Sequence, residues 1–391
     1  MFSLLLAVIY LAFISLGLPD SLLGSAWPLM RLELGAPLSY AGVISTVISV
    51  GTIISSLLSD RLTGRFGAGR VTAVSVALTA AALFGFSVSP SVRVLCLWAI
   101  PYGLGAGAID AALNNYVALH YSSRHMSWLH CFWGVGASLS PVIMRTALSL
   151  TGRWQLGYRS VSLIQIVLTA LLFLSLPLWK VGDAASPEPD NPRRAIGLRG
   201  ALRIPGVPAI LLAFFAYCGA ESTAGLWASS YLAGARGVDA RTAAGFASLF
   251  YLGITFGRFL NGFIADRMGD RRSIRLGAAV MALGALLILL PIPSQLPALA
   301  GLLIFGLGCA PVYPSVIHST PAHFGAENSQ AVIGIQMAGA YVGTTCVPPL
   351  FGVLANSLSL QLYPYVLLVM TALLLCMAER TDRICAGREQ K

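Results

Sequence analysis

Charged residues are scarce in this sequence. Only 10% of its 391 residues are Asp, Glu, Lys or Arg, whereas these residues make up about a quarter of a soluble domain. The sequence also lacks a G-x-x-x-x-G-K-[ST] phosphate loop, an H-E-x-x-H zinc motif and a C-x-x-C pair, which argues against ATP hydrolysis, metalloprotease chemistry and thiol redox chemistry. We therefore expect neither an enzyme nor a nucleic-acid-binding domain, and no metal or cofactor.

Apolar residues are abundant instead. They make up 57% of the chain and give it a mean hydropathy of +0.78. Runs of about 20 residues without a charge recur from end to end, and each is long enough to cross about 30 Å of hydrocarbon. This pattern predicts an all-α, multi-pass membrane protein with twelve transmembrane helices, near residues 3–30, 38–58, 71–90, 94–118, 128–150, 156–179, 207–233, 242–265, 274–292, 297–320, 330–355 and 361–379.

The spans form two groups of six, separated by a polar, proline-containing stretch. We predict an N-terminal half over residues 1–180, a cytoplasmic linker over 181–206 with a short basic surface helix, a C-terminal half over 207–380 and a tail over 381–391. Seventeen of the 25 basic residues fall in the loops on one side, and an excess of basic residues marks the cytoplasmic side. Both termini are therefore predicted to be cytoplasmic, in a bacterial-type inner (plasma) membrane.

The two halves resemble each other at an offset of 201 to 207 residues. Phe13, Asp20 and Gly24 align with Phe214, Glu221 and Gly225; Gly103 and Gly105 with Gly306 and Gly308; Asp60-Arg61 with Asp266-Arg267; and Gly136 and Pro141 with Gly343 and Pro348. Such a repeat predicts two pseudo-symmetric six-helix halves with a binding site at their interface, and alternating access by movement of one half against the other.

The loops after the second and eighth spans carry the family resemblance. Residues 59–65, and more closely residues 262–272, resemble the loop signature of the major facilitator superfamily. Within it, four stretches resemble the fucose/galactose/glucose:proton symporter family: residues 18–24, residues 103–105 with Asp110 and Asn114, residues 217–221, and Tyr313-Pro314. The resemblance implies a secondary transporter, with Asp20 and Asp110 in proton coupling and Glu221 in substrate binding. The span-4 acid is Asp here, where the fucose symporter has Glu.

Three carboxylates are predicted to lie near the middle of the membrane. Asp20 is 11 residues from Arg31 and Asp110 is 10 residues from His120, which places both roughly 15 Å from the membrane faces. Glu221 lies about midway between Arg203 and Arg236. Because a charge at this depth costs about 2.5–3.5 kcal/mol, each acid should face a partner or a cavity, either to carry protons and bind substrate or only to join helices through buried hydrogen bonds.

Polar and aromatic residues near these acids are candidates for sugar recognition, which needs hydrogen-bonding groups and aromatic faces. The predicted substrate-binding residues are Glu221, Asn114, Asn115, His130, Trp133, Trp27, Tyr217, Tyr313 and Gln336. Trp27 follows Asp20 by seven residues, on one face of a continuous helix. By its distance from Pro141, His130 resembles a substrate-binding glutamine of the fucose symporter. For the aromatic residues a packing role stays open.

A second group is predicted to form the cytoplasmic gate: Asp60, Arg61, Arg258, Asp266 and Arg267. Arg258 lies eight residues before Asp266, about 12 Å into the membrane, and with Gly257 it resembles a superfamily feature in which this arginine joins a cytoplasmic charge network. We expect it to serve the gate rather than the substrate.

The sequence as a whole favours a functional monomer that imports a neutral monosaccharide, the small-molecule partner, together with protons, surrounded by membrane lipid. Two other readings stay open. One is a proton-coupled exporter of drugs or metabolites, which would have a more uniformly apolar cavity. The other is an uncoupled facilitator or sensor, for which the acids would be dispensable.

Overall fold

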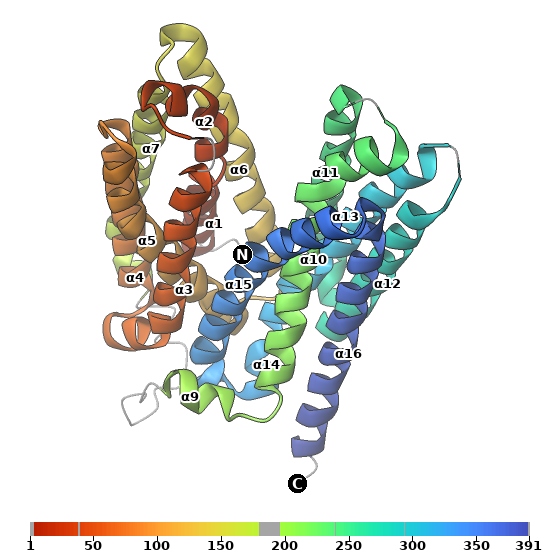
Figure 1. The fold of residues 1–391 in the computed structure, drawn as a ribbon. Helices are drawn as coiled ribbons and strands as arrows, with labels where there is room; N and C mark the ends of the chain where they lie inside the picture. Colours follow the sequence, from red (N-terminus) through yellow and green to blue (C-terminus); the bar gives the residue numbers. More distant parts are fainter. Residues whose placement is uncertain (1–3, 38–39, 180–195, 239, 293, 390–391) are drawn as a thin grey trace. The chain divides into compact units, whose positions relative to one another are not determined.

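The computed structural model describes residues 4–37, 40–179, 196–238, 240–292 and 294–389, and Figure 1 shows that these residues form long α-helices. The chain forms two compact units. Unit 1 is Met1–Tyr116 with Leu129–Gly197, and unit 2 is Val117–Trp128 with Leu198–Lys391. The turn that ends the fourth predicted span and begins the fifth therefore groups with the second half. The predicted boundaries at 180, 206 and 380 stay predictions, and residues 181–195 of the linker lie outside the described part.

Unit 1 holds the helices of the first half, apart from the ends of α5 and α6 that meet at residues 117–128. The helices are α1 (Leu4–Gly17), α2 (Leu22–Glu33), α3 (Tyr40–Phe66), α4 (Ala68–Ser87), α5 (Val92–His120), α6 (Ser123–Thr151) and α7 (Trp154–Leu174). Helix α4 packs along α7. The core of this unit is apolar and includes the fully buried Trp154 and Tyr158.

Unit 2 holds the remaining helices. They are α9 (Gly197–Leu202), which begins at the last residue of unit 1, α10 (Val207–Arg236), α11 (Ala240–Met268), α12 (Asp270–Leu289), α13 (Leu296–His318), α14 (Thr320–Phe324), α15 (Ala326–Ser357), the 3-10 turn η1 (Leu360–Leu362) and α16 (Tyr363–Glu389). Helix α13 packs against α11 and α12, and α10 packs against α15 and α16. Helix α9 covers part of the linker segment in which a short basic helix was expected, and Arg199 is its one basic residue.

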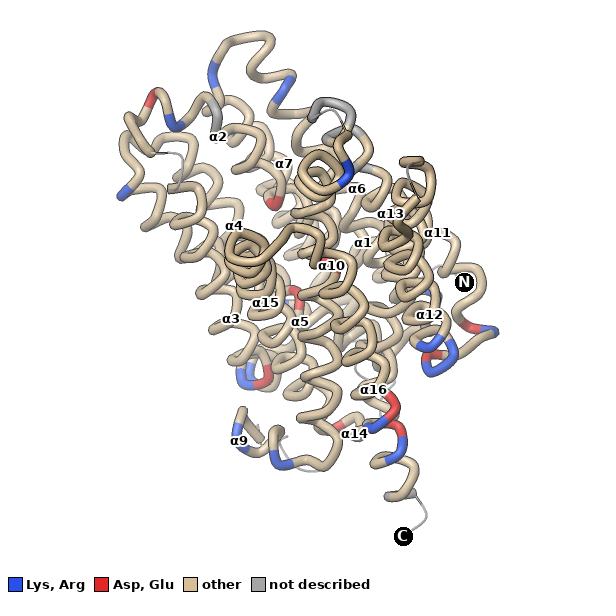
Figure 2. The backbone as a smooth tube through the Cα atoms, turned by 45° about the vertical axis from the view of Figure 1, so that its right-hand side comes forward, with Lys and Arg blue, Asp and Glu red and all other residues tan. Residues whose placement is uncertain are grey.

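The helices match the predicted spans. Among the described residues, ten helical segments are long and apolar enough to cross a membrane, and α1 and α2 together make one of them. The long helices α6 and α11 are not among the ten, since polar side chains such as His130 and Arg258 interrupt them. Figure 2 shows few charged positions along the middle of the helices. The all-α membrane fold with about twelve long helices is thus confirmed.

The first predicted span is not one continuous helix. Residues 18–21 form a turn between α1 and α2, at the Pro19-Asp20 pair. Proline has no backbone N–H to continue the helical ladder, and the chain restarts with the Leu22 amide donating to the Pro19 carbonyl at 3.2 Å. The turn places Asp20 outside regular helix. The expectation that Trp27 shares a helix face with Asp20 was therefore wrong.

Glycines bring helix backbones into contact at equivalent places in the two units. A Cβ on Gly136 of α6 would overlap the Ile14 carbonyl oxygen of α1, and a Cβ on Gly343 of α15 would lie 2.7 Å from the Phe215 carbonyl oxygen of α10. Ile14 and Gly136 precede Phe215 and Gly343 by 201 and 207 residues, which are offsets of the repeat predicted from the sequence. The crossing of the first and fifth spans is thus repeated by that of the seventh and eleventh, as close backbone packing requires small residues.

The repeat corrects one predicted alignment. Gly67 and Gly269 separate α3 from α4 and α11 from α12, with positive φ angles of 79° and 74° that glycine adopts without steric cost. This register places Gly64-Arg65 opposite Asp266-Arg267, so the pairing of Asp60 with Asp266 was wrong. The first copy of the loop has no acid at the position of Asp266.

The helix crossing yields a testable prediction. Gly136→Ala should lower the stability of the detergent-solubilised protein by about 1–3 kcal/mol, because the new methyl group forces α6 away from the α1 backbone. Gly134→Ala is the matched control, since no atom lies within 4 Å of a Cβ at this position on the same helix. Thermal unfolding of both variants tests the prediction. Equal melting temperatures would contradict it.

Candidate functional site

Asp20 lies on the turn between α1 and α2 and binds two neutral donors. Its Oδ1 accepts a hydrogen bond from the Tyr102 hydroxyl of α5 at 3.2 Å, and its Oδ2 accepts one from Trp133 Nε1 of α6 at 2.9 Å. Asp20 is accessible to solvent. A carboxylate with neutral donors and open access can exchange a proton with water without breaking an ion pair.

Asp110 heads a buried chain of polar groups within unit 1. Asn114 Nδ2 donates to Asp110 Oδ1 at 2.8 Å, and Asn114 Oδ1 faces His130 Nε2 at 3.1 Å. All three residues are at most 5% exposed. Because the amide nitrogen of Asn114 serves the carboxyl group, its oxygen is the acceptor, and His130 carries a proton on Nε2. The predicted residues Asp110, Asn114 and His130 therefore form one connected group.

Glu221 of α10 has a charged partner, whereas the described part of the chain offers its counterpart Asp20 the neutral donors Tyr102 and Trp133. Arg258 of α11 lies 3.6 Å from the Glu221 carboxylate, and the arginine side chain is only 5% exposed. Tyr217 lies within hydrogen-bonding reach of both, and its hydroxyl donates to the Cys309 carbonyl of α13 at 3.0 Å. The predicted gate residue Arg258 is thus placed beside a predicted substrate-binding residue. The two charges compensate each other inside unit 2.

The remaining candidates for substrate binding occupy different surroundings. Trp27 is 4% exposed and belongs to the apolar core of unit 1, and Asn115 is 7% exposed. In unit 2, the Tyr313 hydroxyl donates to the sulfur of Met337 at 3.3 Å, and Gln336 Oε1 accepts from the Thr320 hydroxyl at 3.0 Å. Gln336 Nε2 is buried and has no hydrogen-bond partner among the described residues. These roles stay predictions.

Two predicted gate residues lie in unit 1. The backbone amides of Ile196 and Gly197, at the start of α9, act on the Asp60 carboxylate near the end of α3, and Asp60 Oδ2 is buried without a hydrogen-bond partner among the described residues. Arg61, beside it, is exposed. The Asp60 carboxylate therefore lies beside the end of the linker.

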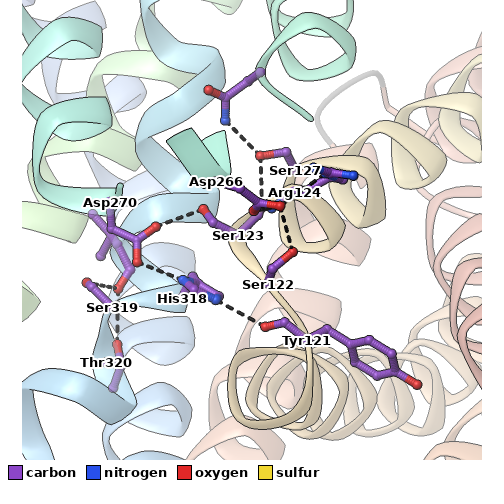
Figure 3. Close-up of polar contacts among 12 residues, drawn as sticks. Tyr121, Ser122, Ser123, Arg124, Ser127, Asp266, Asp270, His318, Ser319 and Thr320 are labelled. Carbon is purple, nitrogen blue, oxygen red and sulfur yellow. Dashed lines mark hydrogen bonds and ion pairs between the residues drawn. The ribbon is translucent and has the colours of Figure 1, made fainter. Parts of the chain in front are cut away.

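Asp266 anchors the turn between α5 and α6 in unit 2 (Figure 3). Its Oδ1 accepts from the Arg124 backbone amide at 2.8 Å, its Oδ2 accepts from the Ser122 hydroxyl at 3.0 Å, and Arg124 Nε lies 3.1 Å from Oδ2. A carboxylate at the first turn of a helix binds amide groups that have no intrahelical partner. The neighbouring Arg267 is exposed.

A second acid extends this contact. Asp270, the first residue of α12, accepts from the Ser123 hydroxyl at 2.8 Å and contacts His318 of α13 at 2.7 Å (Figure 3). His318 also contacts the Tyr121 carbonyl oxygen at 3.1 Å. We call the set formed by Tyr121, Ser122, Ser123, Arg124, Asp266, Asp270 and His318 the clasp.

Sequence reasoning missed several members of these groups. Tyr102, which donates to Asp20, is eight residues before Asp110 on the same helix, and this spacing was the available signal. Asp270 and His318 are 48 residues apart and meet only because α12 and α13 pack together. No sequence motif predicts the contact between Asp270 and His318.

Known proteins resemble this chain over most of its length. "Bypass of stop codon protein 6" of Saccharomyces cerevisiae is 22% identical over 92% of this chain and 79% of that protein. The glucose/mannose transporter GlcP of Bacillus subtilis is 22% identical over 78% of this chain and 77% of its own. Among solved structures, the E. coli fucose:proton symporter FucP in the outward conformation has a TM-score of 0.77 at 16% identity, covering 97% of this chain and 98% of that chain.

The family follows from a match that covers nearly the whole chain. The profile of the Major Facilitator Superfamily matches residues 9–246 and 209–381. The helices of both units, the repeated glycine crossings and the fold of the solved structures agree with it. The chain therefore belongs to the Major Facilitator Superfamily and is a multi-pass integral membrane protein, a secondary transporter of small molecules and not an enzyme.

Proposed function

We propose that this transporter imports a neutral monosaccharide together with a proton, by alternating access of its two halves. The observation that carries the proposal is Asp20. It is an exposed carboxylate held by two neutral donors, Tyr102 and Trp133, in the break between two half-helices. Broken helices in transporters bring backbone and side-chain polar groups to the substrate and ion sites.

The donors of Asp20 connect the proton to the packing of unit 1. Tyr102 and Trp133 donate to the ionised carboxylate, and a protonated carboxylic acid has less capacity to accept both bonds. Protonation of Asp20 therefore loosens its ties to α5 and α6. In the proposed cycle, this change makes the helix arrangement depend on whether the proton is bound.

The ion pair in unit 2 supports a neutral substrate. Arg258 is compensated by Glu221, so this pair presents no net charge to a substrate. An anionic substrate would compete with Glu221 for the arginine, whereas sugar hydroxyls can share the carboxylate oxygens as acceptors. The names of GlcP and FucP, and the sequence motifs described above, also point to a sugar.

The orientation and assembly in the membrane belong to the same proposal. Both termini lie in the cytoplasm of a bacterial-type inner membrane, as the distribution of Lys and Arg indicates. The halves are residues 1–180 and 207–380, joined by the linker 181–206, and one chain is the functional unit. The clasp, together with Asp60 and its contact to α9, then lies at the cytoplasmic end.

Transport by purified protein in proteoliposomes tests the function. Uptake of labelled fucose, galactose, glucose and mannose should rise when an inward pH gradient is imposed. Uptake without dependence on the gradient would identify a facilitator. Export of a drug or metabolite driven by the gradient, without uptake of any sugar in the panel, would identify the exporter instead.

Asp20→Asn should abolish proton-driven accumulation and leave sugar exchange across the membrane intact, because the amide still fits but binds no proton. The accumulation ratio should fall to about one from the roughly tenfold that one proton provides per unit of pH gradient. Glu33→Gln is the matched control, since Glu33 also accepts from a tryptophan indole, Trp154 Nε1, at 2.6 Å. Normal accumulation by the Asp20 variant would contradict the role.

Asp110→Asn should also abolish accumulation, because Asp110 ends the hydrogen-bonded chain through Asn114 to His130. The same measurement of sugar uptake against a pH gradient applies. Ser138→Ala serves as the control on α6, because among the described residues the Ser138 hydroxyl donates within its own helix, to the Gly134 carbonyl. Full accumulation in the Asp110 variant would remove this residue from coupling.

The Glu221–Arg258 pair predicts non-additive effects on stability. Glu221→Gln removes the carboxylate that compensates the buried charge of Arg258, whereas Glu221→Gln with Arg258→Gln removes both charges. The single variant should therefore melt at a lower temperature than the double variant, with a coupling of about 0.5–3 kcal/mol in a double-mutant cycle. Additive shifts in thermal unfolding would show that the pair does not act as a unit.

A further inference from the structure

The hydrogen bonds of the clasp determine how many protons the His318 ring must carry. His318 faces an acceptor on each side of its ring: Asp270 Oδ2 lies 2.7 Å from Nδ1, and the Tyr121 carbonyl oxygen lies 3.1 Å from Nε2. A carbonyl oxygen only accepts, so Nε2 must carry a hydrogen to make its bond. An ionised carboxylate also only accepts, so Nδ1 must carry one as well.

The complete set of bonds therefore contains one proton more than a neutral imidazole beside a carboxylate. That proton is on His318 when Asp270 is ionised, or on Asp270 when the imidazole is neutral, and the count is the same in both cases. Without it, one lone pair of the ring faces either the carboxylate or the carbonyl oxygen. One of the two bonds across the clasp is then lost.

The charged groups around His318 favour retention of the proton. The Asp270 carboxylate of α12 is in direct contact, and the Asp266 carboxylate of α11 is the other charge that acts on the ring. Two further titratable side chains belong to the turn: Arg124 is paired with Asp266, and His125 packs against the Tyr121 ring and also interacts with Asp266. The Asp270 carboxylate is itself held by the Ser123 hydroxyl at 2.8 Å, so the ring, the acid and the turn form one continuous set.

We infer that His318 and Asp270 form a proton-binding site, separate from Asp20 and Asp110, that holds the α5–α6 turn against the ends of α11, α12 and α13 (Figure 3). Closing the clasp takes up one proton, and opening it releases one. Because α5 and α6 meet at this turn, release of the turn frees the ends of these two helices from α11, α12 and α13.

The sign of the pH effect follows from this count. Since the closed clasp binds the extra proton, lower pH stabilises it and higher pH opens it, by linkage. An unperturbed imidazole changes its charge near neutral pH, so physiological changes in pH reach a clasp that contains a histidine. With the proposed orientation, acid in the cytoplasm holds this end of the transporter closed, so the protons that symport carries in would slow further import.

Hydrogen–deuterium exchange of the substrate-free protein in lipid nanodiscs tests the site. The Arg124 amide reports directly, because its hydrogen bond is to Asp266 across the clasp. After correction for intrinsic rates, its opening constant should rise by up to about tenfold per pH unit between pH 6 and 8. In His318→Gln this pH dependence should disappear, because glutamine does not titrate.

His323→Gln is the matched control. His323 also pairs with an aspartate, Asp382, at 3.2 Å, and its variant should keep the wild-type pH dependence. Asp270→Asn provides a second test if the His318 variant folds poorly, and it too should lose the dependence. Equal protection of the Arg124 amide at pH 6 and 8 in the wild type, or an unchanged pH dependence in either clasp variant, would overturn the inference. No substrate is present, so failure of the sugar hypothesis would not affect the result.

Discussion

The hydrocarbon of a bilayer offers no hydrogen-bonding partner, and this constraint governs the whole molecule. Every span is a helix because only a helix satisfies its own peptide groups in lipid. Within this framework, polar side chains occur in groups: Asp20 with Tyr102 and Trp133, Asp110 with Asn114 and His130, and Glu221 with Arg258. Each group joins at least two helices. The few charges in the chain therefore hold the fold together at the places where we propose that they also perform transport.

Apolar periodicity and loop composition were sufficient to predict the helices, because each span needs only length and hydropathy. They did not predict the turn at residues 18–21, since Pro19 is compatible with either a kink or a break. The pairing of Asp60 with Asp266 relied on identical Asp-Arg residue pairs. The alignment of the two loops is instead determined by Gly67 and Gly269, which separate the helices at equivalent places. Geometry at a loop decides which residues are equivalent.

The site was predictable as a set of unusual residues, but their partners were not. Burial cost alone identified Asp20, Asp110, Glu221 and Arg258, yet it could not show that Arg258 lies beside Glu221 or that Trp27 belongs to the core. The clasp depends on residues from four helices, separated by as many as 197 positions. Such contacts depend on tertiary packing, which no local pattern in the sequence encodes.

The repeated glycine crossings have a consequence for the history of the chain. Gly136 against Ile14 and Gly343 against Phe215 keep one backbone contact in both copies, while the acids that correspond, Asp20 and Glu221, have acquired different partners. After duplication, an ancestral half thus retained its architecture twice, while its two copies diverged in charge. One copy has a carboxylate with neutral donors, and the other has a carboxylate paired with a cation. The two halves therefore share their helix packing but differ in the charge around equivalent acids.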